Sequence, residues 1–119
     1  MLGDHVMTNE PVRFNVELNP SIDGNSVKKD LEQLATDLHV DVLGLRSLGR
    51  QLVTGSTSQE TYEEVFGAKL EYVTKTIPHL NKGPYDVQEW QEIRPATVPE
   101  TLRDRVAYIR LEQKFYLTD

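Results

Sequence analysis

Hydrophobic and polar residues alternate near the start of the chain. The apolar positions are Val12, Phe14, Val16 and Leu18, and the residues between them are Arg13, Asn15 and Glu17. A period of two places successive side chains on opposite faces of an extended chain, so the pattern predicts a β-strand with one buried face. The residues that follow, PSIDGN at 20–25, are typical of a turn.

A helical spacing of apolar residues comes next. Val27, Leu31, Leu34 and Leu38 recur three or four residues apart, and Ser26 stands before them as a possible N-cap. This pattern predicts a helix that extends through Leu38.

The middle of the chain predicts a hairpin followed by a short helix. The hairpin strands are 40–47 and 51–54, and Gly55 closes the second. Thr57 and Glu60 have the spacing of a capping box, in which each side chain satisfies a free N–H of the first turn. Tyr62, Val65 and Phe66 then share one helical face, and Gly67 is placed to end the helix in a left-handed conformation.

The expected fold is α+β, a ferredoxin-like βαββαβ sandwich. Residues 69–77 are the expected fourth strand, so the order of elements is the one in which two helices cover one face of a four-stranded antiparallel sheet. The other face of such a sheet is left free for a second layer or for another protein.

The last third of the chain is expected to be a C-terminal extension. Residues 87–93 predict a short strand or a packed segment, and a helix is expected to begin at Pro99, with Leu102, Val106 and Ile109 on one face. The predicted organisation is a flexible N-terminal arm at residues 1–10, a domain at 11–111 and a C-terminal tail at 112–119.

Composition narrows the class of protein. The chain has 119 residues, 38% of them hydrophobic, which suits one soluble domain. A net charge of -6 argues against nucleic acid as a partner, because that affinity depends on Lys and Arg. There is no cysteine, no secretory signal and no apolar run long enough to span a membrane. We therefore expect a cytoplasmic protein that binds no membrane, unless the chain is a prodomain excised from a secreted precursor.

Candidate catalytic residues find simpler explanations. Asp37, His39 and Asp41 are close in sequence, but a helix sends residues two apart to different faces, and His39 suits a helix C-terminus. Ser56 and Ser58 suit a turn and a cap, and no nucleophile elbow or phosphate loop is present. We expect a protein that is not an enzyme and that holds no cofactor or metal.

The C-terminal tail is the candidate partner-binding site. It consists of Lys114, Phe115, Tyr116, Leu117, Thr118 and Asp119. Three large apolar residues are unusual at a chain end, which is normally polar and frayed. The tail either packs back on its own sheet as a final strand or adds a strand in a partner's cleft, where alternate side chains fill pockets.

Two segments carry a resemblance to a known family. The stretch VTGSTSQETYEEVFGAKLEY resembles the part of subtilisin- and sedolisin-type serine protease prodomains in which a Val-Thr-Gly strand leads to a short helix ending in Phe-Gly. The later VPETLRDRVAYIRLE is similar to the Val-Pro-x-x-Leu-x-x-x-Val helix that closes sedolisin-type prodomains. The matched positions are Val53, Thr54, Gly55, Phe66, Gly67, Val98, Pro99, Leu102 and Val106.

The resemblance covers roughly residues 12–111 and implies a ferredoxin-like inhibitor and intramolecular folding chaperone. Its sheet would lie on a subtilisin-like serine protease, and its tail would occupy the substrate cleft. No protease domain follows Asp119, so the chain is either an excised prodomain or, as Met1 and the missing signal favour, a freestanding inhibitor. The alternative function is a noncatalytic regulatory or adaptor subunit that binds another protein.

Overall fold

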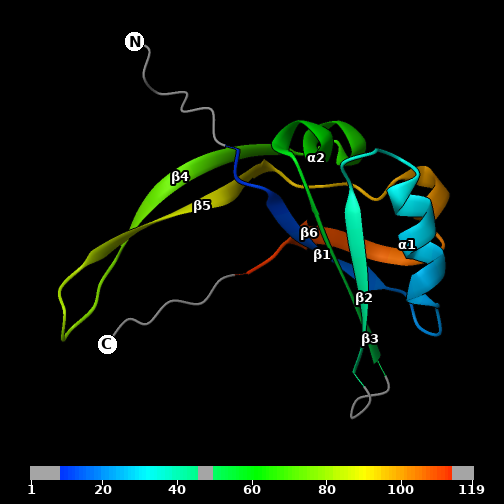
Figure 1. Cartoon of the computed structure of the whole chain (residues 1–119), viewed down its shortest axis with the longest axis horizontal. Helices are drawn as coiled ribbons and strands as arrows, with labels where there is room; N and C mark the ends of the chain where they lie inside the picture. The colour runs from blue at the N-terminus through cyan, green and yellow to red at the C-terminus, as the bar shows by residue number, and fades with distance from the viewer. Residues whose placement is uncertain (1–8, 46–49, 114–119) are drawn as a thin grey trace.

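The computed structural model describes residues 9–45 and 50–113, and within them the protein is α+β, with antiparallel sheets (Figure 1). The elements are β1 (Val12–Leu18), α1 (Gly24–Glu32), β2 (His39–Leu45), β3 (Arg50–Thr57), α2 (Gln59–Phe66), β4 (Lys69–Ile77), β5 (Tyr85–Arg94), the 3₁₀ turn η2 (Glu100–Leu102) and β6 (Val106–Leu111). Four strands form one sheet in the order β2-β3-β1-β6, and β4 pairs only with β5.

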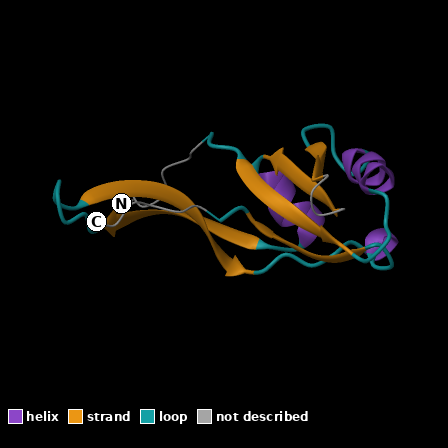
Figure 2. Ribbon diagram, turned by 90° about the horizontal axis from the view of Figure 1, so that it is seen from below, coloured by secondary structure: helices purple, strands orange, loops and turns teal. Residues whose placement is uncertain are grey.

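The prediction that residues 69–77 form the fourth strand of the sheet is wrong. These residues are a strand, but β4 and β5 make a separate hairpin that extends away from the sheet (Figures 1 and 2). The place beside β1 is taken by β6, which runs antiparallel to it with Val16 opposite Ile109. Residues 106–111 therefore complete the main sheet, and they are not part of a C-terminal extension as the sequence predicted.

The prediction of a helix from Pro99 is also wrong. A β-bulge explains why the apolar residues of this segment have a helical spacing. Only η2 is helical in this segment, and residues 106–111 are extended. Along β6, Glu17 faces Tyr108 but Leu18 faces Val106, so Ala107 is an extra residue. A bulge of this kind puts two residues three apart on the same face of a strand. Val106 and Ile109 are both buried, with the spacing of a helix but in a strand.

The boundaries of the two helices differ from the predictions by a few residues. Asp23, not Ser26, caps α1, because its side chain accepts a hydrogen bond from the N–H of Asn25. The helix ends at Glu32 and not at Leu38; the segment beyond it turns, which leaves Leu34 41% exposed. Ser58 caps α2 in place of Thr57, which stays in β3 opposite Val12.

Several local predictions are confirmed. β1 and the β2–β3 hairpin are present, and Gly67 ends α2 with φ 65°. The core lies between the sheet and α1 and α2, and its centre is an aromatic cluster of Phe14, Tyr62 and Phe66, whose ring centroids are 5.1–5.4 Å apart. Aromatic pairs at such distances add to the stabilisation from burial alone.

Candidate functional site: the uncovered face of the sheet

The predicted tail residues Lys114–Asp119 lie outside the described residues, as do most of the predicted arm at 1–10 and His5. The structure places the end of the domain: β6 is an edge strand of the main sheet that ends at Leu111, and the N–H of the next residue, Glu112, still donates to the carbonyl of Arg13.

The main sheet has one covered face and one uncovered face. On β1, Val12, Phe14 and Val16 are buried beneath the helices, whereas Arg13 and Glu17 on the other face are exposed. β2 and β3 alternate in the same way, and on β6 Tyr108 and Arg110 lie beside this face, after the bulge at Ala107. The uncovered face carries Arg13, Asn15, Glu17, His39, Asp41, Leu43, Leu52, Thr54, Ser56, Tyr108 and Arg110.

Three large apolar side chains stand on this uncovered face. Leu43 is 50% exposed and lies opposite Leu52, which is 37% exposed, at the end of the β2–β3 hairpin. Tyr108 is 42% exposed on β6, with the Arg110 guanidinium 5.1 Å from the centre of its ring. Charged residues of both signs separate these positions.

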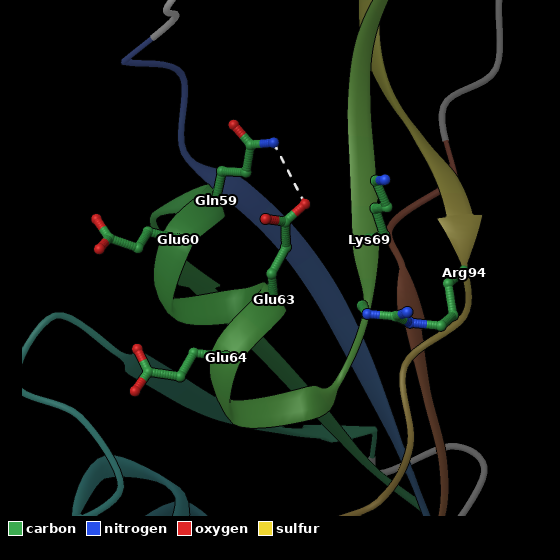
Figure 3. Close-up of a pocket in the computed structure, with 7 residues that line it drawn as sticks. Gln59, Glu60, Glu63, Glu64, Lys69 and Arg94 are labelled. Carbon is green, nitrogen blue, oxygen red and sulfur yellow. Dashed lines mark hydrogen bonds between the residues drawn. The ribbon is translucent and has the colours of Figure 1, made fainter.

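A shallow groove has a structural explanation. It lies between α2 and the start of the β4–β5 hairpin and has a volume of about 540 Å³ (Figure 3). Its lining is Gln59, Glu60, Glu63, Glu64, Ala68, Lys69 and Arg94. Glu63 accepts the N–H of Leu70, and Arg94 Nε donates to the carbonyl of Gly67. Glu63 and Arg94 therefore join the hairpin to α2. The groove is wide, and the side chains of both charges that line it do not point toward a common position.

The polar residues that sequence patterns singled out do not form a reaction centre. Asp37 accepts hydrogen bonds from Thr61 Oγ1 at 2.8 Å and from the N–H of Ser58, and hydrogen bonding from Ser58 and then Thr61 lowers the pKa of its carboxyl. His39 begins strand β2, so its predicted place at a helix C-terminus is wrong. His79 lies in the hairpin turn, where Nδ1 accepts from the N–H groups of Asn81 and Lys82.

The described residues contain no group of three or more His, Asp or Glu side chains placed to hold a metal ion. Over the same part of the chain, no helix has the length and apolar character needed to cross a bilayer. Comparison of the sequence with protein-family models, with curated proteins and with solved structures finds no match.

Proposed function

We propose that the protein is an inhibitor, or a folding chaperone, of a subtilisin-like serine protease. The uncovered face of the sheet would dock on the protease, and residues 114–119 would enter its substrate cleft. Two features of the sheet carry the proposal. Leu43, Leu52 and Tyr108 are exposed on its uncovered face, and its last strand, β6, is an edge strand that precedes the tail in the sequence.

The connections of the main sheet support a ferredoxin-like arrangement with an inserted hairpin. β1 and β2 both run antiparallel to β3, which lies between them, and α1 connects them. β3 and β6 both flank β1, and α2 with the β4–β5 hairpin connects them. If β6 is counted as the fourth strand, this is the split β-α-β pattern that the resemblance to protease prodomains implies.

The proposed mechanism is competitive occlusion. Phe115, Tyr116 and Leu117 would fill the nonprime subsites while their backbone pairs with the edges of the cleft, as an added strand does. A folded domain that holds the tail in place reduces the entropy lost on binding, so affinity comes from preorganisation as well as from tail contacts.

The proposal can be tested with three variants of the full chain against a panel of subtilisin-type serine proteases. Removal of residues 114–119 should abolish inhibition while circular dichroism shows an unchanged fold. Leu43→Glu places a charge on the uncovered face and should weaken inhibition at least tenfold. Leu80→Glu is the matched control, because Leu80 is 84% exposed in the turn of the β4–β5 hairpin, away from that face.

Two results would count against this function. If the intact chain inhibits none of the proteases, inhibition in trans is excluded for that panel and a regulatory or adaptor subunit becomes the better hypothesis. If the intact chain and the truncated chain inhibit equally, the tail is not the inhibitory element.

A further inference from the structure

Strand β5 contacts the main sheet at the two points where the chain enters and leaves it. Trp90 Nε1 donates a hydrogen bond to the carbonyl of Pro11 at 3.2 Å, just before β1. Glu92 Oε1 accepts the backbone N–H of Leu111, also at 3.2 Å, at the end of β6. Two side chains on the same strand thus connect the hairpin to one end of the β1–β6 pair, where β1 begins and β6 ends.

The hydrogen bond to Glu92 satisfies the backbone N–H of Leu111, which β1 does not reach. The N–H of the next residue, Glu112, donates to the carbonyl of Arg13 on β1 at 3.0 Å. Because successive N–H groups of a strand point to opposite sides, the N–H of Leu111 points away from β1, toward the open edge of the sheet. A carboxylate there makes a charge-assisted hydrogen bond, which is stronger than a bond between neutral groups.

The Trp90 contact is supported from within the hairpin. Trp90 lies opposite Tyr72 on β4, with their ring centroids 4.8 Å apart, and it packs against the hydrophobic core. The pair forms one wall of a small cavity of about 50 Å³, on which Leu111 and Glu112 also border. The aromatic pair therefore lies against the segment that leaves the domain.

We propose that the β4–β5 hairpin is a brace that fixes the end of β6, and that Glu92 and Trp90 are positioning residues for this strand end. This inference rests on the proposed function and adds to it the element that fixes the point from which the inhibitory tail extends. A segment already held in its bound direction loses less conformational entropy when it binds. The hairpin should thus strengthen inhibition without itself entering the cleft.

The test uses the full chain with Glu92→Ala, which removes the acceptor, and Glu92→Gln, whose amide oxygen can still accept the N–H of Leu111. Glu71→Ala is the control, because Glu71 is an exposed glutamate of the same hairpin. Two quantities are measured: the hydrogen-exchange rate of the Leu111 amide, by NMR, and the inhibition constant against the protease that the intact chain inhibits.

In Glu92→Ala, the exchange rate of Leu111 and the inhibition constant should each rise about tenfold, the size expected for loss of one hydrogen bond to a charged group. Exchange at Arg110 should not change, because its position within the β1–β6 pairing is independent of Glu92. Glu71→Ala should behave like the unmodified chain, and Glu92→Gln, which keeps an acceptor but loses the charge, should lie between the unmodified chain and Glu92→Ala. A general loss of structure would instead raise exchange at both amides, and the glutamine variant would not restore it.

The outcomes separate this inference from the function it rests on. If Leu111 exchange is unchanged in Glu92→Ala, or if the chain inhibits and Glu92→Ala inhibits equally well, the brace is refuted. If the unmodified chain inhibits no protease, the proposed function fails, and the Leu111 exchange rate alone decides whether the hairpin holds β6. Should Glu92→Ala not fold, Trp90→Phe replaces it: the ring still packs on Tyr72, the bond to Pro11 is lost, and inhibition should weaken several-fold.

Discussion

Glu63 accepts the backbone N–H of Leu70 at 2.7 Å, while Gln59, one helical turn earlier, donates to the carbonyl of the same residue at 3.2 Å. Two side chains of α2 thus satisfy both backbone groups of one residue of β4. These groups can no longer pair with another strand at that point, which helps to explain why β4 leaves the main sheet and β6 lies beside β1.

Removal of this contact should destabilise the domain. Because Leu70 is buried and loses its acceptor, Glu63→Ala should lower the free energy of unfolding by about 1–2 kcal/mol. The neighbouring Glu64→Ala should change it by less than about 0.5 kcal/mol, as is usual for surface substitutions. Urea unfolding followed by circular dichroism measures both. Equal losses in the two variants would show that the bond to Leu70 contributes little.

The first helix repeats this arrangement. Lys28 Nζ donates to the carbonyl of Val40 at 2.7 Å, Glu32 accepts the N–H of Val40 at 3.1 Å, and the two side chains form an ion pair four residues apart. Val40 lies on the edge strand β2, so these contacts satisfy backbone groups that would otherwise be free to pair with another chain. Each helix thus protects the strand that follows it.

Acid should weaken the contact of α1 with β2. The hydrogen bond from Val40, and then that from Lys28, lowers the pKa of Glu32 from its ordinary value of 4.5. A carboxyl with a lowered pKa in the folded state stabilises the fold above its unfolded pKa and loses that contribution as the pH falls through the folded value. Stability should therefore decline below about pH 4.5, with Asp37 adding to the loss at lower pH because its pKa is also lowered.

Glu32→Gln tests this origin of the acid sensitivity. The difference in unfolding free energy between the unmodified chain and Glu32→Gln should be largest at pH 7 and should shrink as the pH approaches 3, because protonated Glu32 resembles the amide. Chemical unfolding at several pH values measures it. A difference that stays constant across this range would rule out Glu32 as a source.

Patterns of apolar and polar residues predicted the helices and strands better than they predicted which strands pair. The alternation around Phe14 and the helical face of Tyr62 and Phe66 depend on neighbours in sequence, and the structure has both. The partner of β1 depends instead on a contact between Val16 and Ile109, far apart in sequence, and nothing within residues 69–77 reveals that β4 will not pair there. The bulge at Ala107 then gave a strand the spacing of a helix.

The candidate site was predicted only in part. A face left free by the two helices followed from the expected order of elements, and the structure exposes Leu43 on it. The contact of Glu92 with Leu111 could not be anticipated, because it required the hairpin and β6 to be placed first. The sequence offered both Thr57, through the capping-box spacing, and Ser58 as caps of α2, and only the burial of Thr57 in β3 decides between them.

Gly55 should not tolerate a side chain. A Cβ at this position would overlap the ring of Phe14, with Cε2 and Cε1 at 2.7 and 2.8 Å. Gly55→Ala should therefore lower the unfolding free energy by about 1–3 kcal/mol, the usual cost of overpacking. Gly44→Ala in the adjacent strand is the control, since nothing lies within 4 Å of its Cβ position. Thermal unfolding should show a lower midpoint for Gly55→Ala alone; equal midpoints would mean that the Phe14 ring moves aside.

Replacement of Tyr62 by phenylalanine should stabilise the protein. The Tyr62 side chain is fully buried, and its hydroxyl has no hydrogen-bond partner among the described residues. An unpaired buried hydroxyl costs free energy, so Tyr62→Phe should raise the unfolding free energy by about 1 kcal/mol and the melting midpoint by about 4 °C.

The gain should grow in alkali. Burial, and then the charge of Glu92, raises the pKa of Tyr62, so its neutral form is favoured in the folded state. Above about pH 10 the unfolded chain ionises at this residue while the folded chain does not, and stability falls with pH. Tyr62→Phe removes that loss. If melting at pH 7 and pH 10.5 shows the same difference between the two chains, the pKa of Tyr62 is the same in the folded and unfolded chains, and burial does not hold the phenol neutral.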